Sequence, residues 1–115
     1  MRQYKLFDKI DQTESYSSEY KEKLKDTYLF FKENGYEFTQ HALGRVIGQK
    51  TGQGKREFTR DEVLEVLKNK PNYTQDEGKS VKFYNNLAVI QANDTDEIVS
   101  IVVRNKVRPG WKEVK

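Results

Sequence analysis

Two residues in the segment 36–48 have types and spacing suited to chemistry on a phosphate group. His41, the only histidine of the chain, precedes Arg45 by four positions. On a helix, residues four apart lie on one face. An imidazole takes and gives a proton near neutral pH, and a guanidinium binds two phosphate oxygens at once. The pair is therefore the first candidate for a site.

Composition excludes several other kinds of site. The 115 residues include no cysteine and one histidine, which rules out disulfides, cysteine-based zinc sites and histidine-rich metal centres. No apolar run approaches the roughly 18 residues that a membrane span needs, and no hydrophobic stretch follows the N-terminal charges as in a signal peptide. If the protein is exported, we expect other sequence to direct it.

The net charge of +3 is unevenly distributed. Each of two segments, 41–60 and 104–115, holds five basic residues against one acidic residue. The basic residues are Arg45, Lys50, Lys55, Arg56 and Arg60 in the first and Arg104, Lys106, Arg108, Lys112 and Lys115 in the second. If folding brings the segments together, a polyanion is the expected partner. The alternative is two solvated loops.

Helices are predicted in the first part of the chain. Apolar residues at spacings of three and four predict a helix over 17–34, with Gly35 ending it. Thr39 is expected to cap a second helix, whose apolar face leaves His41 and Arg45 on the opposite side. Thr59 and Glu62 fit a capping box that opens a third helix, which Pro71 ends.

After residue 71 the pattern alternates. We predict strands at 72–75, 79–84, 87–92 and 97–104, with Asn85 and Asn86 in a tight hairpin turn. The expected fold is α+β, with N-terminal helices packed on a C-terminal four-stranded antiparallel meander. Residues 1–16 are interpreted as a leader or linker remnant, and residues 17–115 as a single domain.

Several short motifs in this order resemble a known family. They are the stretch from Phe38 to Arg45, a glycine-rich basic loop, Phe58-Thr59 at a helix start, and the strands 84–90 and 97–102. Together, over roughly residues 36–104, they are similar to the C-terminal ribonuclease toxin domains of bacterial polymorphic toxins of the contact-dependent inhibition and LXG types. Those domains belong to the barnase, EndoU, colicin and RelE (BECR) group.

The resemblance implies a metal-independent endoribonuclease without a cofactor. Such an enzyme cuts tRNA or another structured RNA by attack of the ribose 2′-hydroxyl on its own phosphate, which leaves a 2′,3′-cyclic phosphate. In this chain His41 would transfer a proton, Arg45 would stabilise the phosphate, and Ser100 would bind the phosphate or orient the imidazole. The second proton-transfer role stays open among Lys50, Lys55, Glu57, a tyrosine and electrostatics alone.

The same resemblance implies partners. RNA would contact the loop residues Lys50, Lys55 and Arg56 and the strand residues Lys82, Tyr84 and Arg104. An acidic cognate immunity protein would neutralise the domain, which is otherwise expected to be monomeric. The domain would not insert into membranes itself. It would be secreted or delivered as part of a larger effector and act in the cytoplasm of a target cell.

Less specific interpretations stand beside these. His41 can be simply exposed, Arg45 can pair with a carboxylate, and Ser100 can bond backbone within its strand. Tyr84 can pack across strands, and Trp111 can dock the C-terminal segment. The alternative functions are a non-catalytic nucleic-acid-binding module and a phage- or secretion-associated interaction domain. The nuclease hypothesis requires His41, Arg45 and Ser100 to converge on one scissile linkage.

Overall fold

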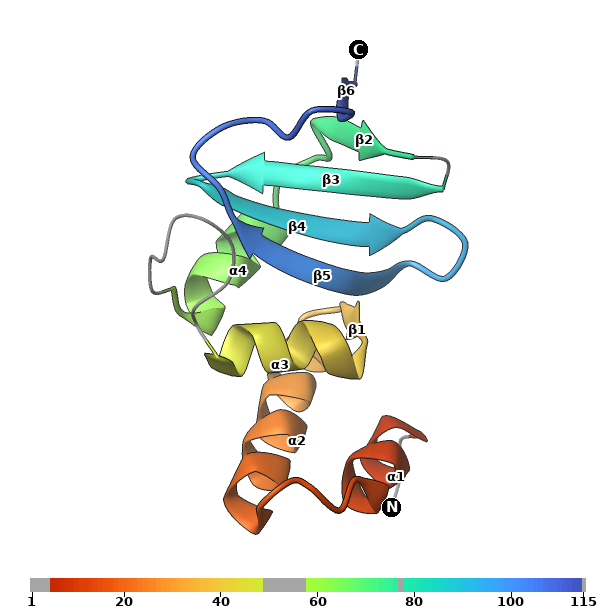
Figure 1. Cartoon of the computed structure of the whole chain (residues 1–115), viewed down its shortest axis with the longest axis vertical. Coiled ribbons are helices and arrows are strands. Elements are labelled where there is room, and N and C mark those ends of the chain that lie inside the picture. Colours follow the sequence, from red (N-terminus) through yellow and green to blue (C-terminus); the bar gives the residue numbers. More distant parts are fainter. Residues whose placement is uncertain (1–4, 49–57, 77, 115) are drawn as a thin grey trace.

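The computed structural model describes residues 5–48, 58–76 and 78–114 and has an α+β fold, as predicted. Its helices are α1 (Lys5–Gln12), α2 (Ser18–Glu33), α3 (Gln40–Gly48) and α4 (Arg60–Leu67). Its strands are β1 (Glu37–Phe38), β2 (Tyr73–Gln75), β3 (Lys79–Tyr84), β4 (Leu87–Ala92), β5 (Glu97–Val103) and β6 (Lys112–Glu113). The strands form one sheet in the order β1-β5-β4-β3-β2-β6 (Figure 1).

Local capping fixes the starts of the predicted helices. The Ser17 hydroxyl accepts a bond from the Tyr20 amide at 3.1 Å at the start of α2, and Gly35 follows that helix at a φ of 92°. The Thr39 hydroxyl accepts from the Ala42 amide at 3.2 Å and so caps α3. Thr59 and Glu62 complete the expected capping box of α4. These side chains satisfy amides that a helix start leaves unpaired.

The sheet differs from the predicted one in its edges. The antiparallel meander β2-β3-β4-β5 is confirmed, with Asn85 and Asn86 both at positive φ in the β3–β4 turn. The expected total of four strands was wrong, because β1 pairs with β5 in parallel and β6 pairs with β2 antiparallel. Both added strands have two residues, which is too short for alternation to be recognised in the sequence.

The helices also lie differently from the prediction. Among the described helices, α3 and α4 make the main contacts with the central strands, whereas α2 packs on α3 and on the edge strand β1, and α1 packs on α2. Figure 1 shows α1 and α2 extending below the sheet. The stacked rings of Phe31 and Phe38, with centroids 4.1 Å apart, join α2 to β1. The apolar stripe of α2 is therefore satisfied by its helical neighbours.

An N-terminal helix forms where none was expected. Ile10 of α1 is completely buried, and the ring of Phe7 meets that of Tyr28 edge to face at 5.9 Å. Asp11 pairs with Lys25 of α2 at 2.7 Å. The apolar positions of α1 span fewer than two turns, so they give no sustained periodicity. Whether residues 1–16 stand apart from the functional domain stays a prediction.

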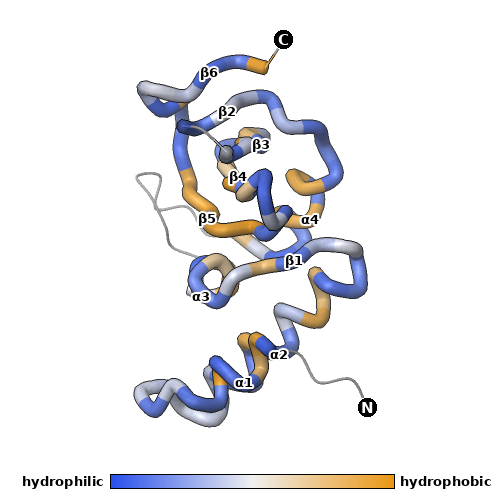
Figure 2. The backbone as a smooth tube through the Cα atoms, turned by 90° about the vertical axis from the view of Figure 1, so that its right-hand side faces the viewer, coloured by the Kyte–Doolittle hydropathy of each residue, from blue (hydrophilic) through white to orange (hydrophobic). Residues whose placement is uncertain are grey.

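The two faces of the sheet have separate apolar clusters. On one face, Val89, Ile101 and Val103 join the main core with the helices. On the other, Val81, Ala88 and Ile90 pack with Trp111. Figure 2, seen nearly along the strands, shows α4 on one side and the chain after β5 returning on the other toward β6. None of the described helices combines the length and apolarity needed to cross a bilayer.

Candidate phosphate-binding site on helix α3

The structure brings His41 and Arg45 together on α3. The Arg45 Nε–H group donates to His41 Nε2 over 3.4 Å. The pair lies on the predicted side of the helix, because Ala42, Leu43 and Val46 are buried on the other. In this contact Nε2 of the imidazole is the acceptor. The helix is tied to β5 at its start, where the Thr39 amide donates to the Ile98 carbonyl at 3.0 Å.

The pair lines an open concavity of about 310 Å³. Three parts of the chain build it, namely the segment between α1 and α2, the first turn of α2, and α3. Its lining residues are Tyr16, Tyr20, Gln40, His41, Gly44, Arg45 and Gly48. We call this the α3 concavity. Among the described residues, its lining offers one guanidinium and one imidazole beside two phenols and an amide, and no carboxylate.

Two tyrosines form one wall of the α3 concavity. Their ring centroids are 4.7 Å apart, and the rings meet edge to face at 70°. Gln40 Nε2 donates to the Tyr16 hydroxyl at 3.0 Å and to Thr13 Oγ1 at 3.4 Å. Burial, followed by the electrostatic effect of Tyr16, raises the pKa of Tyr20 above its usual value. From the sequence, Tyr20 falls in the helix predicted over 17–34, and Tyr16 falls in the segment 1–16, which is interpreted as a leader or linker remnant.

The Tyr20 hydroxyl packs against α3 at Gly44, where there is no side chain to displace it. A Cβ atom at Gly44 would lie 3.2 Å from that hydroxyl oxygen. This is tighter than an ordinary van der Waals contact, so any larger residue would displace the phenol. The glycine one turn after Gln40 therefore allows α2 and α3 to approach closely beside the His41–Arg45 pair.

Ser100 does not join the pair. It lies opposite Ile90, whose side chain belongs to the Trp111 cluster, whereas the next residue, Ile101, belongs to the main core with the helices. Among the described residues no hydrogen bond connects its hydroxyl to His41 or Arg45. The expected convergence of His41, Arg45 and Ser100 on one linkage is therefore not found. This removes the three-residue form of the nuclease hypothesis and leaves the His41–Arg45 pair.

A β-bulge explains the position of Ser100. Gln91 pairs with Ile98 and Ile90 pairs with Ser100, which leaves Val99 as an extra residue in β5. Without the bulge, Ser100 would share the face of Ile98, which is part of the main core. The extra residue reverses the alternation, and Ser100 faces the opposite way.

Lys82 and Tyr84 have partners at the end of α4. The Lys82 ammonium donates to the Leu67 carbonyl at 2.6 Å, and the Tyr84 hydroxyl donates to the Lys70 carbonyl at 2.6 Å. Burial lowers the pKa of Lys82. Both side chains fasten the segment after α4 to β3. Neither lines the α3 concavity, so we leave both out of the candidate site.

The remaining predicted residues divide between the C-terminal segment and the part of the chain that is not described. Arg104 lies over the Trp111 ring, with its guanidinium carbon 5.8 Å from the centroid. Trp111 donates from Nε1 to Gln75 Oε1 at 2.8 Å and is only 8% exposed, so it docks the C-terminal segment on the sheet. The predicted loop residues lie outside the described residues; they are Lys50, Lys55, Arg56 and Glu57.

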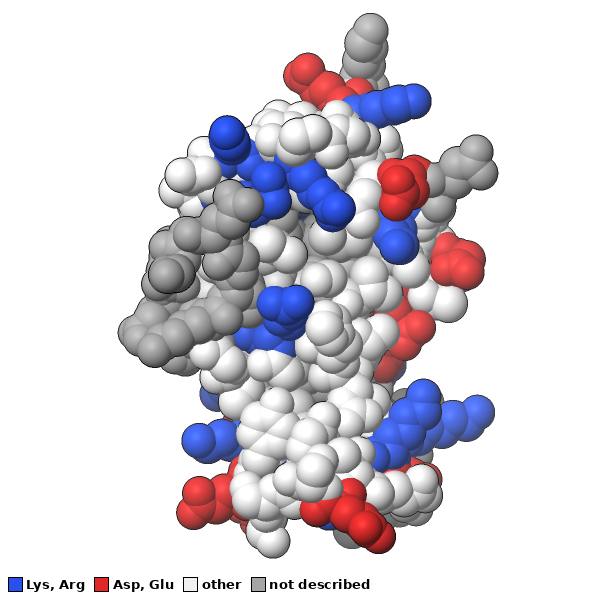
Figure 3. Space-filling view, viewed as in Figure 1, with Lys and Arg blue, Asp and Glu red and all other residues white. Residues whose placement is uncertain are grey.

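Basic and acidic side chains are mixed over the face shown in Figure 3. Blue basic side chains gather in the upper left, where the chain leaves β5, and others lie beside red acidic side chains at the helical end below and along the right-hand edge. This face therefore has one local basic group rather than two regions of opposite charge.

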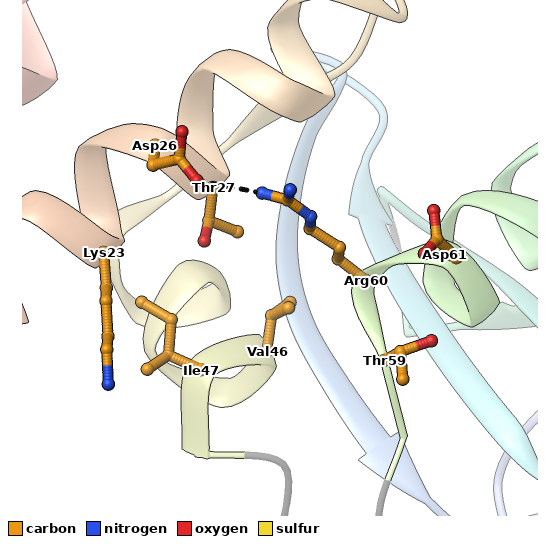
Figure 4. A pocket seen from close by; sticks show the side chains of 8 residues that line it. All are labelled: Lys23, Asp26, Thr27, Val46, Ile47, Thr59, Arg60 and Asp61. Atoms are coloured by element: carbon orange, nitrogen blue, oxygen red, sulfur yellow. Dashed lines mark hydrogen bonds and ion pairs between the residues drawn. The ribbon is translucent and has the colours of Figure 1, made fainter.

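A larger concavity of about 460 Å³ lies between α2, α3 and the start of α4 (Figure 4). Its charges are mixed, since Lys23 and Arg60 accompany Asp26 and Asp61. Arg60 Nη1 is already paired with Asp26 Oδ2 at 3.1 Å. This concavity is thus less suited to an anion than the α3 concavity. Nowhere in the described parts of the chain do three metal-ligating side chains of the His, Cys, Asp and Glu types group together.

Comparison with known proteins does not assign the chain to a family or a function. No protein-family model matches the chain, and no curated protein or solved structure is significantly similar to it. A function is therefore inferred from the side chains themselves.

Proposed function

We propose that the chain is a metal-independent endoribonuclease toxin domain that cuts tRNA or another structured RNA. The supporting observation is the His41–Arg45 pair, with Arg45 Nε 3.4 Å from His41 Nε2 in an open concavity whose described lining holds no carboxylate. The proposal includes the partners implied by the resemblance to ribonuclease toxin domains, an acidic immunity protein and a larger effector that delivers the domain to the cytoplasm of a target cell.

The chemistry starts at a neutral imidazole. When an RNA phosphate binds the Arg45 guanidinium, that guanidinium exchanges its bond to His41 for phosphate oxygens and leaves Nε2 as a base. Nε2 takes the 2′-hydroxyl proton, the 2′-oxygen bonds to phosphorus, and the bond from phosphorus to the 5′-oxygen breaks. The leaving oxygen takes a proton from water or a second side chain, and the products are a 2′,3′-cyclic phosphate and a 5′-hydroxyl. Arg45 balances the charge on the phosphorane oxygens.

Ser100 has no part in this scheme, because its strand face is opposite the one that packs with the helices. The same observation favours a second candidate, a nucleic-acid-binding module without catalysis. In that case the α3 concavity holds a phosphate, and His41 transfers no proton.

Cleavage of total RNA by the purified chain tests the proposal. With EDTA present, we expect discrete fragments that end in 2′,3′-cyclic phosphates. The His41→Ala variant should lose cleavage by about 100-fold or more while retaining RNA affinity, since it removes the base but not the cation. Arg45→Gln should weaken both RNA cleavage and RNA affinity by about tenfold or more, because it removes a charge-assisted phosphate contact.

Two control variants sharpen the result. Arg60→Gln removes a guanidinium that is paired with Asp26 outside the α3 concavity, and Ser100→Ala removes the hydroxyl left out of the scheme. Both should cleave like the wild type. RNA binding without any cleavage would favour the second candidate, and cleavage that persists in His41→Ala would contradict the assignment of His41.

A further inference from the structure

We infer that Tyr16, Tyr20 and Gln40 form a subsite for an unpaired nucleobase, beside the phosphate position at Arg45. The inference rests on the proposed function and narrows its substrate to RNA in which the nucleotide at the cut is not base-paired. Three observations support it, namely the paired rings of Tyr16 and Tyr20, the orientation of the Gln40 amide, and the close packing at Gly44.

The tyrosine pair supplies an aromatic surface next to a cation. Tyr16 and Tyr20 both line the same concavity as Arg45. Since the rings meet edge to face at 70°, one ring supports the other without a parallel stack between them. Both tyrosines line the concavity without being stacked on each other, and bases stack on aromatic side chains irrespective of base identity. Because a stacked base must leave its own helix, this surface selects unpaired nucleotides.

The Gln40 amide gives the subsite a directed polar group. Its Nε2 group is engaged by the Tyr16 hydroxyl at 3.0 Å and by Thr13 Oγ1 at 3.4 Å. These bonds fix the amide plane, and among the described residues no donor reaches the carbonyl oxygen. An amide oxygen accepts from an N–H group. All four bases carry such a group on the edge used in base pairs, where a duplex partner would block it.

Packing holds the subsite together from both sides. The Tyr20 hydroxyl fits against α3 because Gly44 has no Cβ, and Tyr16 enters from the segment between α1 and α2. Gln40 and His41 are the first two residues of α3. A nucleobase held by Gln40 and the tyrosines is therefore adjacent to the imidazole of His41, the proposed proton acceptor.

Nucleotide titrations followed by NMR test the subsite. The signals of the sole histidine report binding at the α3 concavity. The probes are the four nucleoside 3′-monophosphates, with ribose 5-phosphate as the ligand that lacks a base. We expect wild type to bind the nucleotides at least about fivefold more tightly, the lower end of the range for stacking one base. Tyr20→Leu should remove this preference and leave ribose 5-phosphate affinity within about twofold.

Gln40→Ala gives a second variant, should Tyr20→Leu fail to fold, and it should reduce the preference for nucleotides. Its matched control is Gln91→Ala, because the Gln91 amide bonds the Asp96 carbonyl on another part of the sheet. Equal affinity of wild type for nucleotides and ribose 5-phosphate would overturn the subsite, as would a preference that survives both Tyr20→Leu and Gln40→Ala. RNA cleavage without a nucleotide preference would refute the subsite alone, whereas a preference without cleavage would refute the nuclease alone.

Discussion

Among single residues, Tyr20 links the packing of α2 on α3 to the chemistry of the α3 concavity. Its hydroxyl contacts the backbone side of α3 at Gly44, and burial raises its pKa. A group whose pKa is raised in the folded state stabilises the protein below its unfolded pKa of about 10. That contribution is lost as the pH rises through the raised value. High pH should therefore weaken the fold through this phenol.

The Tyr20→Phe variant tests this linkage. Its free energy of unfolding should fall less between pH 9 and about 11 than that of wild type, because the variant has no proton to lose at this position. Urea unfolding at a series of pH values measures the difference. Tyr84→Phe serves as the control and should keep the wild-type decline, since Tyr20 is intact. Equal declines in wild type and Tyr20→Phe would contradict the assignment.

The site was only partly predictable from the sequence, for reasons that differ by residue. His41 and Arg45 share a helix face by local spacing, so their contact could be foreseen. Tyr16 and Gln40 meet through tertiary packing of the segment after α1 against α3, which no local pattern records. Ser100 was assigned to the site, but a single extra residue in β5 turned it to the other face. The resemblance to ribonuclease toxins stays a prediction.

At the scale of elements, α4 shows how strongly one local motif defines a helix. The Glu62 amide donates to Thr59 Oγ1 at 3.3 Å, and the Thr59 amide donates to Glu62 Oε1 at 3.2 Å. We expect Thr59→Ala to lower the free energy of unfolding by about 1 kcal/mol, because the capping hydroxyl is lost. Urea denaturation measures the change. Thr59→Ser keeps a hydroxyl and should retain most of the stability, so equal loss in both variants would argue against capping.

The long elements were predictable because each carries its own signals. The signals of each element are local, because a capping residue, an apolar spacing or the paired asparagines of the β3–β4 turn can be recognised within a few neighbouring positions. The short elements carry none, since β1 and β6 exist only through the strands beside them. Helix α1 likewise becomes ordered through Ile10 and its contacts with α2. Sequence patterns thus predicted the meander and the three capped helices, but not the additions around them.

Over the whole molecule, Ile10 connects the N-terminal helix to the main core. It is completely buried, and we expect Ile10→Ala to destabilise the fold by about 2–4 kcal/mol through lost apolar contact and a cavity. Urea denaturation gives the value, and Val107→Ala, at a position that is 38% exposed, is the control expected to change it little. A negligible effect of Ile10→Ala would support the interpretation of residues 1–16 as a separate leader.

The two-residue strands at the margins of the sheet have a consequence for solubility. An unpaired strand edge is a template for other chains, and long, flat edges promote aggregation. Here β6 covers Tyr73 and Thr74 of the three-residue strand β2, so the margin on that side is very short, whereas β1 pairs only with Glu97 and Ile98 of β5. Loss of the segment that carries β6 and Trp111 would expose both an edge and an apolar surface. A chain shortened in this way should associate with itself even where its meander remains folded.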